Sequence, residues 1–266
     1  MTPTEHLLRG LGRLLAGYLT RPDPRYAPPA TSSAGDLQRA LQPADVLLVE
    51  GNTRVSTAIK YLTQSTWSHA ALYIGEQAGL KNDAGQALVL IEADLMNGVC
   101  AVPLGKYAEF HTRICRPVGL TEADAASVIR YAVSRIGHSY DLKNLIDLAR
   151  YLLPTPPVPQ RLRRRMIALG SGEPTRALCS TLIAEAFQSV KYPILPYLEH
   201  RPQGTPGCDS CVDEVLRARH HTLFAPRDFD ISPYFRVVKP RIERGFDYRS
   251  LQWSEAPEKI VPLSGR

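Results

Sequence analysis

Short apolar runs separated by turn residues recur in the first half of the chain and predict β-strands. Residues 69–75 (HAALYIG) are typical, because five apolar or small residues follow a histidine and a glycine ends the run. The dipeptide Asn97-Gly98 is a tight-turn signal between two further runs. The runs follow one another closely, so we expect an antiparallel meander. The predicted strands are residues 46–49, 69–75, 88–91, 99–102 and 112–117.

The period of the apolar positions changes to that of helices from Thr121 onward. Apolar residues then recur three and four positions apart as far as Ile136, and Gly137 is a stop signal. Strands followed by helices, without regular alternation of the two, predict an α+β fold in which an antiparallel sheet or small barrel packs on helices. The other predicted helices are residues 56–65, with Ser56 as N-cap, 141–154 and 177–190.

The length of 266 residues suits one domain with tails. Residues 1–36 predict an amphipathic leader helix and a Pro-rich linker, and residues 37–245 predict the domain itself. Within it, residues 141–176 combine an apolar helix, prolines and arginines, which favours an insertion that forms a lid. Residues 246–266 are expected to be a tail.

The charge pattern bears on partners. Hydrophobic residues make up 44% and charged residues 22%, as in a soluble globular protein. The net charge is +6, and the basic residues are most concentrated in RLRRR. Such a cluster favours binding to an anionic membrane surface, which the leader helix would also contact. The plainer interpretation is a basic face exposed to solvent. The leader could instead dock on the domain or on a second copy of the chain, and nucleic acid is not expected because no aromatic or zinc-finger signature accompanies the charge. The cluster comprises Arg161, Arg163, Arg164 and Arg165.

The cysteines indicate a reducing compartment. Five is an odd number, and no export signal precedes them, so we expect a cytoplasmic protein, with peripheral membrane association as the alternative. Cys208 and Cys211 form a single CxxC pair. A structural zinc site needs a second pair of ligands, so the pair leaves a zinc or redox role open without predicting one.

Three residues have the chemistry of a thiol nucleophile with its partners. Cys179 is predicted in the first turn of a helix, where the helix dipole and unpaired N–H groups stabilise a thiolate. His69 begins one predicted strand and Glu92 ends another. An imidazole can act as base, and a carboxylate can orient it from the far nitrogen. Singly, each residue also fits an ordinary structural role, and the hypothesis rests on the combination.

These motifs resemble a known superfamily. The segments LQPADVLLVEGNTRVSTAIKYLTQSTWSHAALYIGE, IEA, GHSYDLKNL and LCSTLIAEAF are similar to the circularly permuted branch of the NlpC-type papain-like cysteine peptidases and amidases, the YiiX/YebB-like group, with lecithin:retinol acyltransferase as a more distant relative. In that branch the histidine precedes the cysteine, as His69 precedes Cys179 here. The resemblance covers roughly residues 41–190 and implies a permuted papain-like fold with the nucleophile at a helix N-terminus.

The resemblance also implies roles for individual residues. Cys179 corresponds to the nucleophile, His69 to the general base and then acid, and Glu92 to the orienting residue. Tyr140 corresponds to a tyrosine that lines the site and supports the oxyanion, although helix-entry packing is an equal alternative. Ser180 and Trp67 are expected to line the substrate or oxyanion site. Leu178 and Thr181 depart from the Asp and Gly that flank the nucleophile in the cell-wall enzymes, so no substrate class transfers.

We therefore predict a papain-like thiol hydrolase or acyltransferase that acts through a thioester on a peptide- or cell-wall-type amide or on a lipid-like acyl substrate. This chemistry requires neither a metal nor an organic cofactor. The alternative is an inert module of the same fold that binds a lipid or peptide at a membrane surface.

Overall fold

The computed structural model describes residues 17–23, 26, 28–94, 97–138, 178–202, 212–243, 245 and 247–250. Several expectations fall outside this part of the chain: the leader helix, the helix at 141–154, the lid at 141–176, Tyr140, the arginine cluster, the Cys208/Cys211 pair and most of the tail. They stay predictions. No helix within the described residues is long and apolar enough to cross a membrane.

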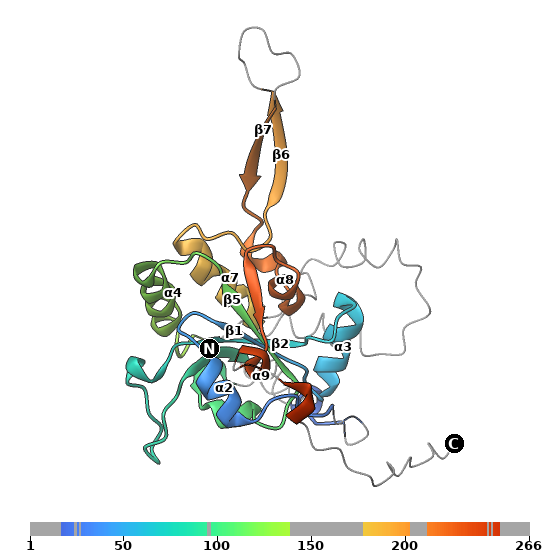
Figure 1. The fold of residues 1–266 in the computed structure, drawn as a ribbon, viewed down its shortest axis with the longest axis vertical. Helices are drawn as coiled ribbons and strands as arrows, with labels where there is room; N and C mark the ends of the chain where they lie inside the picture. The colour runs from blue at the N-terminus through green and yellow to red at the C-terminus, as the bar shows by residue number, and fades with distance from the viewer. Residues whose placement is uncertain are drawn as a thin grey trace, which may run out of the picture.

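A six-stranded antiparallel sheet organises the fold (Figure 1). Its strand order is β4-β3-β2-β1-β5-β8, and a separate hairpin, β6-β7, projects from the body. The strands are β1 (Val46–Val49), β2 (His69–Tyr73), β3 (Leu90–Asp94), β4 (Gly98–Val102), β5 (Thr112–Pro117), β6 (Tyr197–Pro202), β7 (Val212–Arg217) and β8 (Phe235–Val238).

Helices cover the sheet and join its strands. The longest described ones are α4 (Glu122–Ser134) and α7 (Leu178–Ser189), which pack against each other. The others are α2 (Ala34–Ala40), α3 (Arg54–Thr63), α8 (Pro226–Asp230), α9 (Pro240–Glu243) and the 3-10 turns η1 (Glu76–Ala78), η2 (Leu104–Tyr107), η3 (His221–Leu223) and η4 (Tyr248–Ser250).

The α+β fold class is confirmed, but the predicted meander order of the strands is wrong beyond β4. β5 pairs with β1 rather than with β4, so the chain crosses back to the other side of the first strand. The burial of β1 gives the reason. All four of its residues are at most 1% exposed, and a strand so fully buried needs partners on both of its edges.

Two local boundaries also differ from the sequence interpretation. Thr53, rather than Ser56, caps α3: the Thr53 hydroxyl accepts a hydrogen bond from the Ser56 backbone N–H at 3.2 Å. Glu92 lies inside β3 instead of at its end, because the ladder with β4 continues through Glu92↔Cys100 to Asp94↔Gly98. Gly98 has a φ of +67°, as the predicted tight turn requires.

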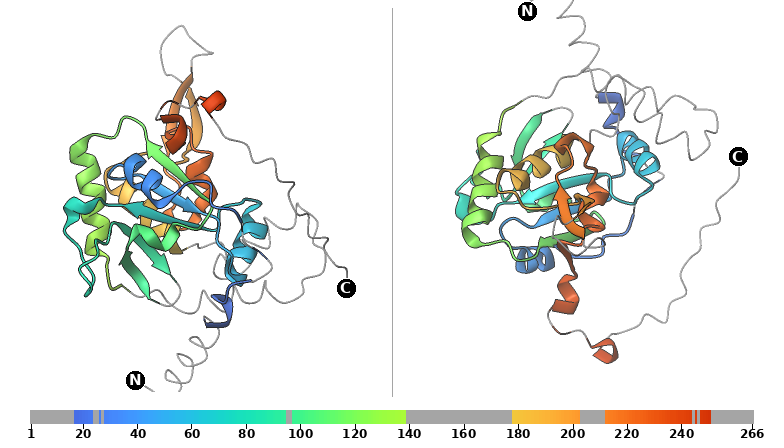
Figure 2. Two further views of the ribbon diagram at one scale, coloured as in Figure 1. Left: turned by 60° about the horizontal axis from the view of Figure 1, so that its bottom comes forward. Right: turned by 90° about the horizontal axis from the view of Figure 1, so that it is seen from above.

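Alternating side chains of the sheet enter two separate cores. Val46 and Leu48 of β1 belong to the cluster that contains residues of α4, α7 and α8. Leu47 and Val49 point to the opposite face, where α2 and η2 contribute. Figure 2 shows α2 on the other side of the sheet from α4 and α7. Each face is therefore covered, and α7 is fixed over the middle strands.

Candidate active site

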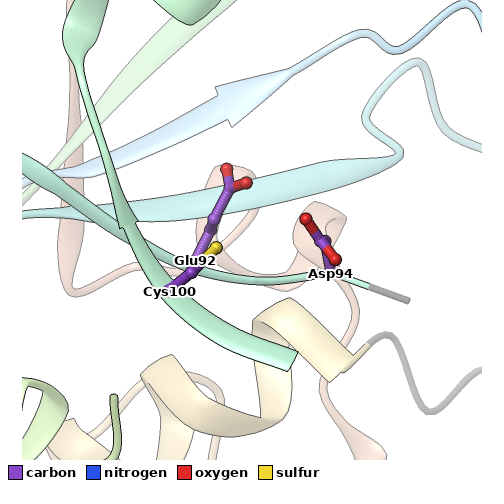
Figure 3. Close-up of side chains that lie close together, drawn as sticks. All are labelled: Glu92, Asp94 and Cys100. Atoms are coloured by element: carbon purple, nitrogen blue, oxygen red, sulfur yellow. The ribbon is translucent and has the colours of Figure 1, made fainter. Parts of the chain in front are cut away.

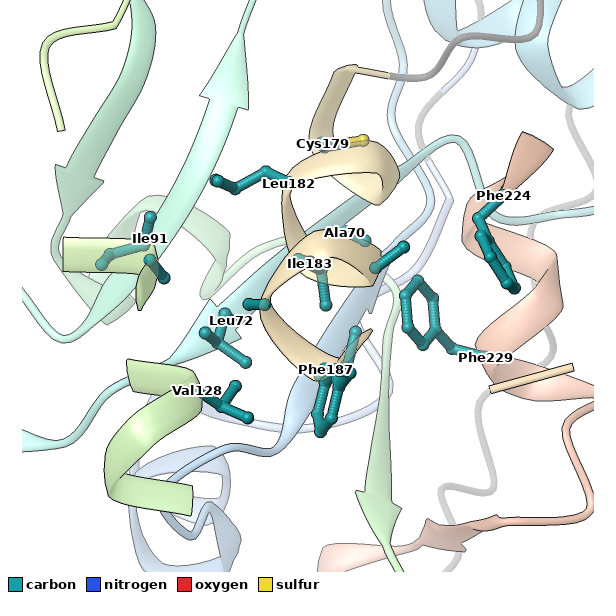
Figure 4. Close-up of a cluster of buried hydrophobic side chains, with 14 of the residues drawn as sticks. Ala70, Leu72, Ile91, Val128, Cys179, Leu182, Ile183, Phe187, Phe224 and Phe229 are labelled. Carbon is teal, nitrogen blue, oxygen red and sulfur yellow. The ribbon is translucent and has the colours of Figure 1, made fainter. Parts of the chain in front are cut away.

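The first turn of α7 places Cys179 against the sheet where two strands separate. The ladder between β2 and β3 joins Leu72 to Ile91 and Tyr73 to Leu90, and α7 packs on both strands. Figure 4 shows Cys179 at the start of α7, with Leu182 and Ile183 following it into the core. The thiol is 3% exposed and accepts a hydrogen bond from the Ala70 backbone N–H.

The apolar residues of α7 explain this placement. Leu182, Ile183, Ala186 and Phe187 are each at most 1% exposed. Such a helix is held by packing on several sides, so it cannot rotate about its axis without opening cavities. The position of the thiol is therefore set by the core beneath it.

His69 is the first residue of β2 and stands between Cys179 and Glu92. Its Nε2 lies 3.1 Å from Oε2 of Glu92, and its side chain also hydrogen bonds to Cys179. The imidazole side chain keeps 21% exposure, whereas the carboxylate of Glu92 keeps none. The three predicted residues thus meet in the structure, with the imidazole in the middle.

The protonation states of the thiol and the imidazole depend on each other. Burial alone disfavours both charged forms. The neighbouring thiolate and carboxylate outweigh that penalty and raise the pKa of His69 to about 10. The imidazolium in turn outweighs burial and lowers the pKa of Cys179, aided by hydrogen bonds from Ala70 and Ser180. The arrangement favours a thiolate–imidazolium pair.

Glu92 is a fully buried carboxylate with three partners. His69 and the hydroxyl of Tyr107 donate to Oε2, and the ammonium of Lys106 donates to Oε1. Burial would raise the pKa of Glu92, but His69 and Lys106 reverse this and lower it to about 2. Glu92 is therefore ionised at neutral pH, and its buried charge is compensated.

Lys106 and Tyr107 were not identified from the sequence. They lie on η2, in the connection between β4 and β5, and a short turn of this kind has no apolar period that would single out its polar residues. Only the strand register, which places the end of this turn over Glu92, brings them to the site.

The remaining expected site residues are placed as follows. Ser180 is fully buried, and its hydroxyl lies 3.9 Å from the Cys179 sulfur. Trp67 is 3% exposed, and its Nε1 donates to Asp230 of α8 at 3.0 Å. Its ring also lies 5.0 Å from that of His111. Tyr140 lies outside the described residues.

One group within the described part of the chain has the chemistry of metal ligands. Glu92, Asp94 and Cys100 place one donor atom each within 4.8 Å of one another (Figure 3). These three side chains are unfavourable ligands for a cation, because the ammonium of Lys106 already neutralises the carboxylate of Glu92. Burial also raises the pKa of Cys100 to about 11, which keeps its sulfur protonated. Binding would have to displace both the ammonium and that proton.

Comparisons with known proteins find a matching family model. Residues 40–151 match the family model of the permuted papain-like amidase enzymes, YaeF/YiiX, C92 family. The matched segment contains His69 and Glu92 and ends before Cys179. No curated protein matches the chain. Among solved structures, the crystal structure of metalloprotein yiiX from Escherichia coli O157:H7 aligns at 14% identity and a TM-score of 0.42, covering 74% of this chain and 96% of that one.

The family match supports a cysteine hydrolase of the amidase class. The antiparallel sheet packed on helices agrees with it. Residues 40–151 of this chain are therefore similar to the permuted papain-like amidases.

Proposed function

We propose that this protein is a thiol amidase in which Cys179 is the nucleophile, His69 the general base and acid, and Glu92 the residue that orients the imidazole. The hydrogen-bonded series from Cys179 through His69 to Glu92 carries the proposal. A structural histidine would not need a fully buried carboxylate on one side and a thiol at a helix N-terminus on the other.

The first half-reaction follows from the charges of this series. The thiolate attacks the carbonyl carbon of the amide, and the carbonyl electrons move onto oxygen. N–H groups in the first turn of α7 lack partners within the helix and are suited to stabilise that oxyanion. His69 then gives its proton to the amide nitrogen, the C–N bond breaks, and the amine leaves. The acyl group remains on Cys179 as a thioester.

The second half-reaction regenerates the enzyme. Neutral His69 takes a proton from water as the water attacks the thioester carbonyl, and the acid is released as the C–S bond breaks. Glu92 accepts a hydrogen bond from Nε2 throughout, which stabilises the imidazolium without itself taking the proton. The amidase description of the matching family supports water as the acyl acceptor.

Transient acylation tests the nucleophile without knowledge of the natural amide. The protein is mixed with p-nitrophenyl acetate, quenched in acid and mapped by peptide mass spectrometry. We expect a burst of p-nitrophenolate and an acetyl group on Cys179.

Cys179→Ala should abolish the burst, and the control Cys100→Ala should leave it within about twofold, since burial raises the pKa of Cys100 to about 11 and its thiol is unreactive at neutral pH. Acetylation of other residues with Cys179 left free would refute the assignment.

A further inference from the structure

The turn η2 supplies two of the three groups that hold Glu92, and His69 supplies the third. Lys106 and Tyr107 are consecutive, yet they reach different oxygens of the same carboxylate, Oε1 and Oε2. Each oxygen therefore has a donor from η2, and Oε2 has His69 as well. A carboxylate fixed at both oxygens cannot rotate away from the imidazole.

The two donors differ in their surroundings. Tyr107 is 5% exposed and its ring centroid lies 5.9 Å from that of His69, so it packs against the imidazole as well as bonding to the carboxylate. The Lys106 side chain is 40% exposed and contributes a positive charge from the solvent side. Tyr107 thus supplies orientation, while Lys106 supplies charge.

A fully buried carboxylate without such partners takes up a proton, because burial in an apolar environment penalises the charged form. A protonated Glu92 would lose its ion pair with the imidazolium. A more basic Glu92 would also compete with His69 for the proton that the proposed reaction gives to the leaving amine. The function of His69 therefore requires a carboxylate that stays ionised.

We propose that Lys106 and Tyr107 are positioning residues that keep Glu92 ionised and directed at Nε2 of His69, so that the mobile proton stays on the imidazole. This inference rests on the proposed function, since it assigns these residues a role in the same reaction. Both residues hydrogen bond to Glu92, so their effect on catalysis passes through Glu92 and His69.

The titration of Glu92 measures this role directly. Protein labelled with ¹³C at the glutamate carboxyl carbons is followed by NMR between pH 3 and pH 7, and Glu92→Gln identifies the resonance. In the parent, we expect Glu92 to stay ionised to the low end of this range. In Tyr107→Phe and in Lys106→Met, the midpoint should rise into this range, because a donor or a positive charge is lost.

Two further variants separate positioning from packing. Lys106→Arg restores the charge and should return the midpoint to that of the parent. Tyr73→Phe removes a buried tyrosine hydroxyl from the same apolar cluster and should leave Glu92 unchanged. Because the Lys106 side chain is partly exposed, Lys106→Met keeps the test valid if Tyr107→Phe fails to fold.

The acid limb of acylation by p-nitrophenyl acetate should move to higher pH in the same two variants. If Glu92 stays ionised to pH 3 in both variants, as in the parent, the positioning role is overturned. Failure of the proposed function looks different: Cys179 would not acylate in the parent, whatever the titration of Glu92.

Discussion

At the scale of single residues, Glu92 shows how burial and charge are balanced at this site. It has no exposed surface, and burial by itself would favour its neutral form. Hydrogen bonds and positive charges from His69 and Lys106 outweigh that effect. The carboxylate therefore contributes to folding stability only while it is ionised, which makes stability depend on pH.

The sign of this dependence follows from the lowered pKa. The contribution is fully present above the ordinary value of 4.5 and is lost as the pH falls through about 2. The depression corresponds to about 3 kcal/mol. Between pH 5 and the lowest pH at which both proteins fold, the free energy of unfolding of the parent should fall toward that of Glu92→Gln. Urea unfolding at a series of pH values measures this; parallel curves for the two proteins would contradict it.

At the scale of elements, α7 connects the core to the chemistry. Its Phe187 is fully buried and packs edge to face on Phe235 of β8, with the ring centroids 5.3 Å apart. Cys179 lies two turns earlier on the same helix. A change in packing at Phe187 should therefore affect both the stability of the domain and the position of the thiol.

Phe187→Ala should lower the free energy of unfolding by about 3 to 5 kcal/mol, the usual cost of removing a buried aromatic ring. Urea unfolding followed by circular dichroism gives the value. Leu198→Ala on β6 is the matched control, because that side chain is 60% exposed and should change stability by less than about 0.5 kcal/mol. Equal losses of unfolding free energy in the two variants would contradict the packing of α7 through Phe187.

The sequence predicted elements best where local signals were sufficient. The apolar run of β1, the helical period that begins at Thr121 and forms α4, and the turn at Gly98 all depend on residues close together in the chain. The predicted cap of α3 was wrong because Ser56 is the stronger N-cap type, whereas the backbone is extended at Thr53. Lys106 and Tyr107 depend on long-range register and could not be predicted locally.

At the scale of the whole molecule, the described residues form two antiparallel sheets that do not pair with each other. The six-stranded sheet carries His69 and Glu92, while the hairpin of β6 and β7 forms a sheet of its own and projects from the body (Figure 1). Leu198 and Leu216 face each other across this hairpin and are 60% and 48% exposed. The hairpin therefore adds little to the core on which the site rests.

Substitution of both leucines by serine should leave the acetylation burst at Cys179 within about twofold and the melting temperature within about 2 °C, since exposed side chains away from the core contribute little. Differential scanning fluorimetry and the burst assay measure the two quantities. A large loss of the burst would show that the hairpin takes part in the site.

The measurement that tests the central claim most directly is the pH dependence of Cys179 alkylation by iodoacetamide, resolved by peptide mass spectrometry in the parent and in His69→Ala. Normalising each thiol to its own plateau removes differences in access. Because His69 lowers the pKa of Cys179, the parent thiol should be half reactive at a pH below the ordinary value of 9.0, and this midpoint should rise in His69→Ala. Cys100 should react only as the pH approaches about 11. A Cys179 midpoint near the ordinary value of 9.0 in both proteins would contradict the thiolate–imidazolium pair.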